Sequence, residues 1–211
     1  MSSVLRAIAA RLGRTPLVGD ALEHRFAELK SEAAAPVTPP VANAVTCFLA
    51  EAERNLFEIS KHSPIDTLIT YLADNHLPVV LSMQPSVRSL NWQPVAEKLT
   101  DDYRSPAIGV VEAIAGIAET GTVAIRSIDV PSGMLFLCEE LVIILRLERI
   151  LALQEDLWQT LSPGTDRALH LISGPSRTAD VEQTLQVGAH GPRRAYLWLL
   201  TENGDPVPPA P

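Results

Sequence analysis

The sequence predicts an α/β fold built on a mostly parallel sheet with helices on both sides. Two observations lead to this class. Short apolar runs such as "AIGVV" and "ELVIILRL" alternate along the chain with segments whose apolar residues recur at helical spacing. The runs are apolar at nearly every position, which is typical of strands that are buried on both faces of a parallel sheet.

A helical arm is expected before this domain. Residues 20–30 carry an apolar stripe at helical spacing, formed by Leu22, Phe26 and Leu29. The alanines and prolines of "SEAAAPVTPP" then indicate a linker, because a residue that precedes proline avoids the helical conformation. We expect the arm to dock on the body or on a partner, and docking on a second copy would give a homodimer.

These boundaries divide the chain of 211 residues into three parts. The arm and linker take residues 1–40, the α/β domain takes 41–203, and a flexible tail takes 204–211. Within the domain, a helix is expected from about Pro40 through the apolar positions Val45, Leu49, Ala52, Leu56 and Ile59. A second helix follows over 63–77, with Ser63 as N-cap and Pro64 as its first residue.

Strands and helices alternate through the rest of the domain. Strands are expected over residues 78–82, 107–111, 121–126, 140–147, 168–173 and 194–200. Helices are expected between them over residues 112–118, 148–161 and 176–187.

Composition excludes several classes of function. The net charge of −8 argues against a nucleic-acid partner, because phosphate contacts require a concentrated positive surface. The longest apolar run, "MLFLCEELVIIL", is interrupted by Glu139 and Glu140 and is too short for a membrane span. Residues 1–14 contain spread arginines and no continuous apolar stretch, so a secretory signal is not indicated. A cytoplasmic protein is expected.

The cysteines and histidines do not form a metal-binding pattern. Cys47 and Cys138 are far apart, and each stands among apolar neighbours, which indicates buried free thiols. Without a C-x-x-C pair, the chain alone cannot supply an iron–sulfur cluster or a structural zinc site. The five histidines show no H-x-x-x-H spacing, so a metal enzyme is disfavoured.

The loop "ISGPSRTAD" carries the first group of candidate binding residues. Its hydroxyls and cation, expected at a helix N-terminus, would suit a phosphate or carboxylate. The residues are Ser173, Gly174, Ser176, Arg177 and Thr178. The alternative is a capped helix with no ligand, which explains the serines but not a positive charge at the positive end of a helix dipole.

Two further loops carry polar residues. In "GAHGPRR", His190, Arg193 and Arg194 could bind a ligand or a partner's acidic surface, or complement a helix C-terminus. A simple strand–helix–strand order would place this loop at the end of the sheet opposite "SGPSRT".

The third loop, "AETGT", contains Glu119, Thr120, Gly121 and Thr122. The carboxylate of Glu119 could act catalytically, as base or nucleophile, and the threonines could hold a ligand. The alternative is a polar turn in which glycine supplies a positive φ.

Taken together, these motifs resemble the lactate-utilisation protein C family, also called the LUD domain. The family pattern reads I-S-G-P-S-R-T-A-D-I-E, then G-V-H-G-P-R-R after a short segment. The chain matches it with Val181 in place of isoleucine and Ala189 in place of valine. The upstream A-[DE]-T-G-T motif matches at 118–122. The middle region, "SIDVPSGMLFLCEELVIIL", departs from the family because it lacks a histidine and has only Arg126 nearby.

The resemblance implies a fold like that of the ribose-5-phosphate isomerase, glucosamine-phosphate deaminase and CoA-transferase group. It also implies a subunit of a complex that oxidises L-lactate to pyruvate, in which partner proteins carry the iron–sulfur clusters. The chain would then be a non-iron–sulfur component of a lactate dehydrogenase complex, with no cofactor of its own. Its loops would hold a small carboxylate or phosphate.

Two alternatives remain open from the sequence. The chain could be a non-catalytic scaffold that uses its loops for folding and its basic residues for docking. It could also be a stand-alone enzyme acting on a sugar phosphate, a folate or a CoA thioester, which rests on fold analogy alone.

Overall fold

The computed structural model describes residues 10–11, 13, 19–32, 43–60, 64–128, 130–161, 167–179, 185–187 and 191–201. The chain forms two compact units, Met1–Pro39 and Pro40–Pro211, and each is considered by itself. In the first unit, α2 (Asp20–Glu32) is the helix expected over 20–30. Its acidic first turn favours the helix N-terminus, and Arg25 pairs with Glu28 at 2.9 Å.

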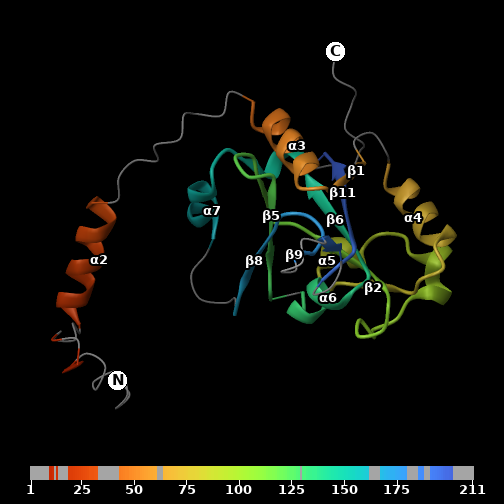
Figure 1. Ribbon diagram of the computed structural model, residues 1–211, viewed down its shortest axis with the longest axis horizontal. Helices are drawn as coiled ribbons and strands as arrows, with labels where there is room; N and C mark the ends of the chain where they lie inside the picture. Colours follow the sequence, from red (N-terminus) through yellow and green to blue (C-terminus); the bar gives the residue numbers. More distant parts are fainter. Residues whose placement is uncertain are drawn as a thin grey trace. The chain divides into compact units, whose positions relative to one another are not determined.

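A five-stranded parallel sheet forms the centre of the second unit (Figure 1). Its strand order is β1-β11-β6-β3-β2, and every neighbouring pair is parallel. The strands are β1 (Glu58–Ser60), β2 (Val79–Leu81), β3 (Ile108–Glu112), β6 (Glu140–Arg146) and β11 (Arg194–Leu200). The mostly parallel sheet predicted from the apolar runs is therefore confirmed.

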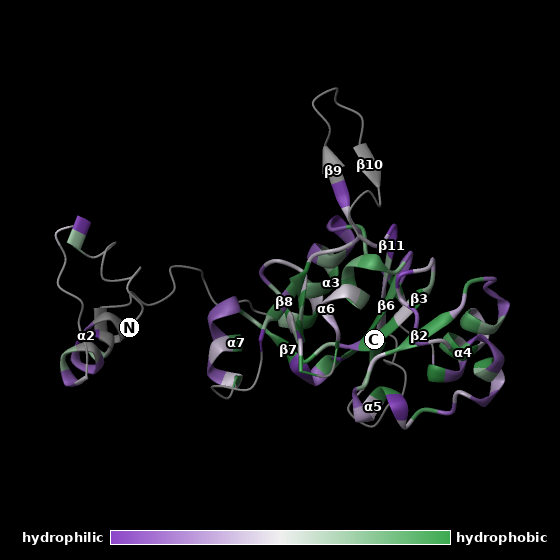
Figure 2. Ribbon diagram, turned by 90° about the horizontal axis from the view of Figure 1, so that it is seen from below, coloured by the Kyte–Doolittle hydropathy of each residue, from purple (hydrophilic) through white to green (hydrophobic). Residues whose placement is uncertain are grey.

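Alternate residues of the central strands pack against different layers. Leu141, Ile143 and Leu145 of β6 belong to a core with α3 (Ala44–Arg54) and α6 (Ser132–Leu137). Val142 and Ile144 belong to a second core on the opposite face. That core is covered by α4 (Ile65–Asp74), α5 (Pro85–Arg88) and η1 (Gln93–Lys98). Figure 2 shows hydrophobic residues concentrated in the strands between these layers, as a sheet covered on both faces requires.

A second sheet of four strands lies beside the first core and has the order β7-β4-β5-β8. It contains β4 (Ala115–Ile117), β5 (Thr122–Arg126), β7 (Ile150–Leu151) and β8 (Leu169–Ile172). The β4–β5 and β5–β8 pairs are antiparallel, and the β4–β7 pair is parallel. A separate antiparallel pair consists of β9 (Arg177–Ala179) and β10 (Leu185–Val187).

Three expected helices are wrong wholly or in part. Residues 115–117 form β4, because hydrogen bonding to β5 and burial of all three residues outweigh the helical preference of an alanine-rich segment. Within 148–161, the chain forms η2 (Leu147–Arg149) and β7 before α7 (Gln154–Thr160) begins. The 176–187 segment forms β9 and β10 instead of a helix, and residues 180–184 lie outside the described residues.

Two helix ends also differ from the expectation. The helix α3 ends at Arg54, and Leu56 then adopts a positive φ of 65°, so Ile59 belongs to β1. At the start of α4, Pro64 occupies the N-cap position in an extended conformation, and Ser63 lies outside the described residues. None of the helices in the described ranges is long and apolar enough to cross a membrane.

Both cysteines are free thiols. Cys138 is buried at the junction of α6 and β6, as expected, and Cys47 is only half-buried. Burial raises the pKa of Cys138 to about 12, so its thiol stays protonated at neutral pH.

Candidate functional site

The "AETGT" turn and the "SGPSRT" loop lie side by side. The hydroxyl groups of Thr122 and Ser173 share a hydrogen bond of 2.7 Å, and the Thr122 side chain is buried. The register explains the contact, because Val123 of β5 pairs with Ile172 of β8. Two of the three loops singled out in the sequence therefore meet in the four-stranded sheet.

Both loops approach the C-terminal end of α3 through glycines with positive φ. At Gly121, with φ 62°, a Cβ atom would lie 2.4 Å from the backbone nitrogen of Ala52. At Gly174, with φ 94°, it would lie 2.0 Å from the carbonyl oxygen of Asn55. The Asn55 side chain also donates a hydrogen bond to the Thr120 carbonyl at 2.7 Å. Only glycine allows this approach of the loops to α3.

The "HGPRR" loop reaches the same place, which corrects the expectation that it lies at the opposite end of the sheet. The Ser176 backbone N–H donates to the Pro192 carbonyl at 2.9 Å. A Cβ atom on Gly191 would lie 2.9 Å from the Ser176 Cβ. The expectation failed because it assumed a helix over 176–187. Instead, β9 and β10 pair antiparallel, so that the chain after β10 returns to the loop that precedes β9.

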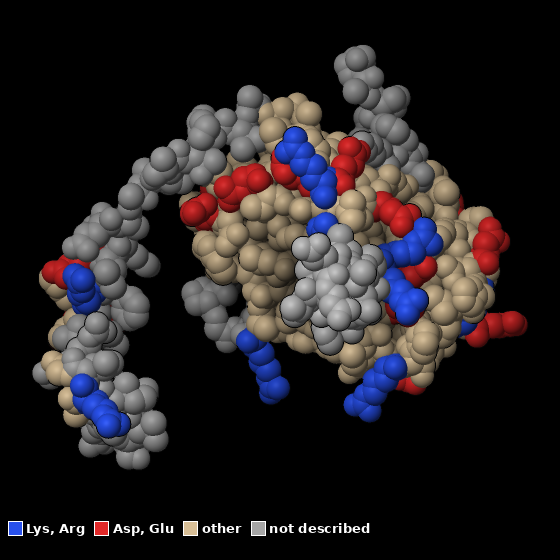
Figure 3. Space-filling view, in the orientation of Figure 1, with Lys and Arg blue, Asp and Glu red and all other residues tan. Residues whose placement is uncertain are grey.

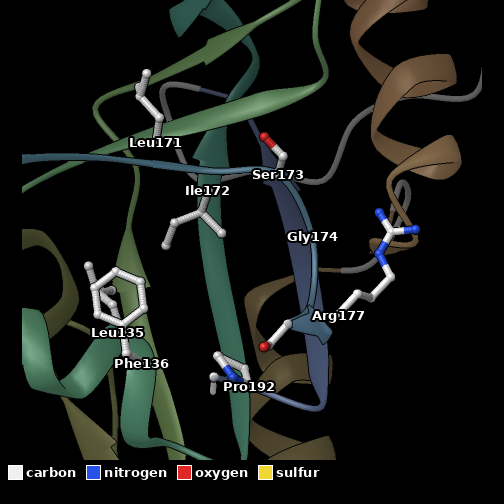
Figure 4. A pocket seen from close by; sticks show the side chains of 10 residues that line it. Leu135, Phe136, Leu171, Ile172, Ser173, Gly174, Arg177 and Pro192 are labelled. Carbon is white, nitrogen blue, oxygen red and sulfur yellow. The ribbon is translucent and has the colours of Figure 1, made fainter. Parts of the chain in front are cut away.

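A pocket of about 300 Å³ opens where these segments meet. Its residues come from α6, the end of β8, the Ser173–Arg177 loop and the Gly191–Pro192 turn. Figure 4 shows the side chains of Leu135, Phe136, Ile172 and Pro192 converging on one region. The side chains of Leu171 and Ser173 point away from it. The pocket is therefore lined by an apolar wall together with Ser176, Arg177 and the loop backbone.

The location of this pocket differs from the expected carboxyl edge of the parallel sheet. The Ser173–Arg177 loop follows β8, which is a strand of the four-stranded sheet. The Gly191–Pro192 turn precedes β11, and Leu135 precedes β6, so the pocket adjoins the amino ends of these parallel strands. The expectation was wrong because it placed β8 in the parallel sheet.

Arg177 lies at the rim of the pocket. Its side chain is exposed, and Figure 4 shows the guanidinium group directed away from Leu135 and Phe136. Within the described ranges, no carboxylate forms an ion pair with it at the distances that define the other pairs. The predicted helix N-terminus beside it is absent, because Arg177 begins β9. The side chain of Thr178 lies outside the described residues.

Glu119 binds within the protein. Its carboxylate accepts a hydrogen bond from the backbone N–H of Gln154 at 2.7 Å, and it therefore satisfies a donor at the start of α7. Its own backbone N–H donates to the Ala152 carbonyl at 3.2 Å. Of the residues that the structure describes, neither Glu119 nor Thr120 to Thr122 lines the pocket. The contacts of Glu119 fit a structural role, and its catalytic role remains a prediction.

Arg193 and Arg194 form ion pairs with acidic residues of neighbouring strands. Arg193 pairs with Glu139 at 3.2 Å, and its backbone N–H donates to the Glu139 carbonyl at 2.8 Å. Arg194 donates two hydrogen bonds of 2.9 Å to Glu58, and its guanidinium lies 5.0 Å from the centre of the Tyr196 ring. These contacts fix the start of β11. His190 lies outside the described residues.

Glu140 extends this cluster toward α4. It accepts a hydrogen bond from the Tyr71 hydroxyl and lies 3.5 Å from Arg194. Burial and the hydrogen bond with Glu140 raise the pKa of Tyr71. On the face of the molecule drawn in Figure 3, cationic and anionic groups lie next to one another.

A polar cluster that the sequence did not predict lies at the carboxyl edge of the parallel sheet. Glu112, at the end of β3, is 3% exposed and pairs with Arg149 at 2.9 Å and Arg146 at 3.4 Å. The Gln84 side chain bonds both the N–H and the carbonyl of Glu112 at 2.7 Å. These groups satisfy one another's charges and hydrogen bonds, which indicates a structural role for the cluster.

Sequence reasoning also missed the apolar wall of the pocket. Leu135 and Phe136 belong to an apolar run that had no periodicity to separate a core residue from a pocket residue. Their place became visible only once α6 was seen packed beside β8. A proline and glycine around Ser132, which begins α6, were the only local signal of a turn there.

The LUD domain family model matches residues 56–200, which include all three loops. The chain belongs to the LUD domain family. It is 34% identical over 133 residues to the uncharacterized protein YkgG of Escherichia coli, a match that covers 57% of the chain and 55% of that protein.

A second relative is the lactate utilization protein C of Bacillus pumilus. It is 54% identical over 35 residues, which cover 17% of the chain and 15% of that protein. The chain thus spans about half the length of YkgG, and a smaller share of the second relative. The crystal structure of a DUF162 family protein from Deinococcus radiodurans has the same fold, with a TM-score of 0.50 at 14% identity. The match covers 76% of the LUD chain and 99% of that protein.

Proposed function

We propose that this LUD protein is a subunit of an L-lactate utilisation system and binds a small organic anion in the pocket beside β8. One observation carries the proposal. Two of the segments that match the family pattern, 172–177 and 191–192, converge on one pocket, although thirteen residues separate them. The third, 118–122, supports the pocket through the bond between Thr122 and Ser173. The name of the Bacillus relative supports lactate utilisation as the pathway.

The chemistry of the pocket rim favours an anion. Arg177 offers a permanent positive charge with several donors, and Ser176 offers a hydroxyl beside the Gly191 turn. A carboxylate at the rim would form charge-assisted hydrogen bonds with these groups. Loss of such a partner costs roughly 2–4 kcal/mol of binding free energy.

Iron–sulfur proteins are the proposed partners in the oxidation of lactate to pyruvate. The two cysteines of this chain, Cys47 and Cys138, form no C-x-x-C pair of the kind that supplies cluster ligands. The chain would then act as the non-iron–sulfur component, and homodimerisation through its N-terminal arm remains part of the proposal.

The first test measures anion binding at the rim. Isothermal titration calorimetry with lactate, pyruvate and phosphorylated acids should show binding to the wild-type protein at millimolar concentration or below. Arg177→Ala should weaken binding by about 30- to 1000-fold, the equivalent of the estimated 2–4 kcal/mol.

The matched control is Arg167→Ala, which removes an exposed arginine that does not line the pocket. This variant should bind as the wild type does. Equal binding by the Arg177→Ala protein, or the absence of binding by any acid, would overturn the proposal.

A scaffold function has less support from the contacts. It requires Arg193 to dock an external partner, whereas Arg193 already pairs with Glu139 of its own chain. A stand-alone enzyme that uses Glu119 has less support as well, because the Glu119 carboxylate is bonded to Gln154.

A further inference from the structure

We infer that the pocket prefers organic acids with an aromatic or branched aliphatic body over lactate itself. This inference rests on the proposed anion-binding function and adds the class of ligand. Three observations support it: the apolar wall, the volume of the pocket and the fixed position of Phe136.

The first observation is the apolar wall. Leu135 is almost fully buried, Pro192 is buried, and both converge with Phe136 and Ile172 on the pocket (Figure 4). The apolar surface that a ligand can cover comes mainly from Phe136 and the partly exposed Ile172, and a polar ligand with a single methyl group would cover only part of it. A ligand with a larger apolar body would bury more of the Phe136 ring together with its own apolar surface, which favours binding in proportion to the buried area.

The second observation is size. The volume of about 300 Å³ lies at the lower limit for pockets that hold drug-sized ligands. Lactate is much smaller than such ligands. The remaining space matches an additional ring or branched chain.

The third observation is the ring of Phe136. It is 45% exposed and lines the pocket, so a ligand there can contact it. His170 of β8 meets it edge to face, with ring centres 5.5 Å apart and an angle of 77° between the planes. The Ser132 hydroxyl bonds the Nε2 atom of His170 at 2.8 Å. The Phe136 ring is therefore held in place as a surface for an aromatic group.

The ligand orientation follows from the positions of these groups. The apolar body would lie against Phe136 and Ile172, and the carboxylate would lie toward Ser176 and Arg177 at the rim. Such a molecule needs both an apolar body and an acid group.

Calorimetric titration with three compounds tests this preference. Lactate and phenyllactate share the hydroxy acid group and differ by a ring, whereas phenylpropanol has the ring without the acid. Phenyllactate should bind about 10- to 100-fold more tightly than lactate, because the ring buries apolar surface. Phenylpropanol should bind more weakly than phenyllactate.

Two variants test whether the preference for phenyllactate over lactate arises from the Phe136 ring. Phe136→Ala should remove most of the difference between phenyllactate and lactate. Leu137→Ala is the matched control, because Leu137 is the next residue of α6, is 54% exposed and does not line the pocket. It should keep the difference. Unchanged melting temperatures would show that both variants are folded.

Several outcomes would overturn the inference. If lactate binds as tightly as phenyllactate and Arg177→Ala weakens both, the preference is wrong and the proposed function stands. If Phe136→Ala and Leu137→Ala reduce the difference equally, the ring does not lie against Phe136. If neither acid binds, the inference and the proposed function both fail.

Discussion

Single residues decide how closely the family loops approach α3. Gly121 and Gly174 both have positive φ, and both lie where any side chain would collide with the backbone of Ala52 or Asn55. The same glycines place Thr122 and Ser173 within hydrogen-bonding distance and thereby support the pocket. At these positions the match to the family pattern has a packing explanation that does not depend on a ligand.

Substitution of Gly174 tests this explanation. Gly174→Ala combines an unfavourable φ with a clash against the Asn55 carbonyl, so it should lower the free energy of unfolding by about 2–4 kcal/mol. Gly133→Ala is the control, because its Cβ would meet only the Tyr103 side chain, at 2.8 Å, and that ring can shift. Urea unfolding should show the larger loss for Gly174→Ala, and similar losses would contradict the packing explanation.

At the scale of elements, the β9–β10 pair determines where the site lies. A helix over 176–187 would have carried the chain to the opposite end of the sheet. The two antiparallel strands instead return the chain to the loop that precedes β9. The return allows the N–H of Ser176 to bond the Pro192 carbonyl and completes the pocket. The ion pairs of Arg193 and Arg194 then fix β11 immediately after the turn.

The junction between α6 and β6 gives a prediction about pH. Burial raises the pKa of Cys138 from 9.0 to about 12, so the folded thiol keeps its proton where the unfolded thiol loses it. This contribution to stability is complete below pH 9 and is lost as the pH rises toward about 12.

Urea unfolding of the wild type and of Cys138→Ala, at about pH 8 and about pH 10.5, measures this contribution. The wild type should lose more stability than the variant between the two pH values. Buried tyrosines affect both proteins alike, so the difference reports on the thiol. An equal loss in both proteins would contradict the assignment.

At the scale of the whole molecule, the sequence predicted the parallel sheet well because its strands are buried on both faces. The run at 140–147 and the run at 194–200 are apolar at nearly every position, and both became central strands. The short strands were harder to predict. β4 and β10 depend on a partner strand for their hydrogen bonds, and no local pattern specifies that partner.

The site was predicted only in part, for the same reason. Gly174, Ser176 and Arg177 line the pocket as the loop motif indicated, whereas the Ser173 hydroxyl bonds Thr122. Phe136 and Leu135 reach it through the packing of α6 beside β8, which local sequence does not encode. Glu119 was singled out for its carboxylate, yet its bond to Gln154 depends on α7, whose start was misplaced.

A nuclear magnetic resonance titration tests the central claim, that the converging loops form a ligand site. Isotope-labelled protein would be titrated with phenyllactate while the backbone amide signals are followed. If the claim is correct, the largest shifts fall on Gly174, Ser176, Phe136 and Gly191, and the amides around Glu112 and Arg149 stay unchanged. Shifts confined to that opposite cluster, or no shifts at millimolar acid, would contradict it.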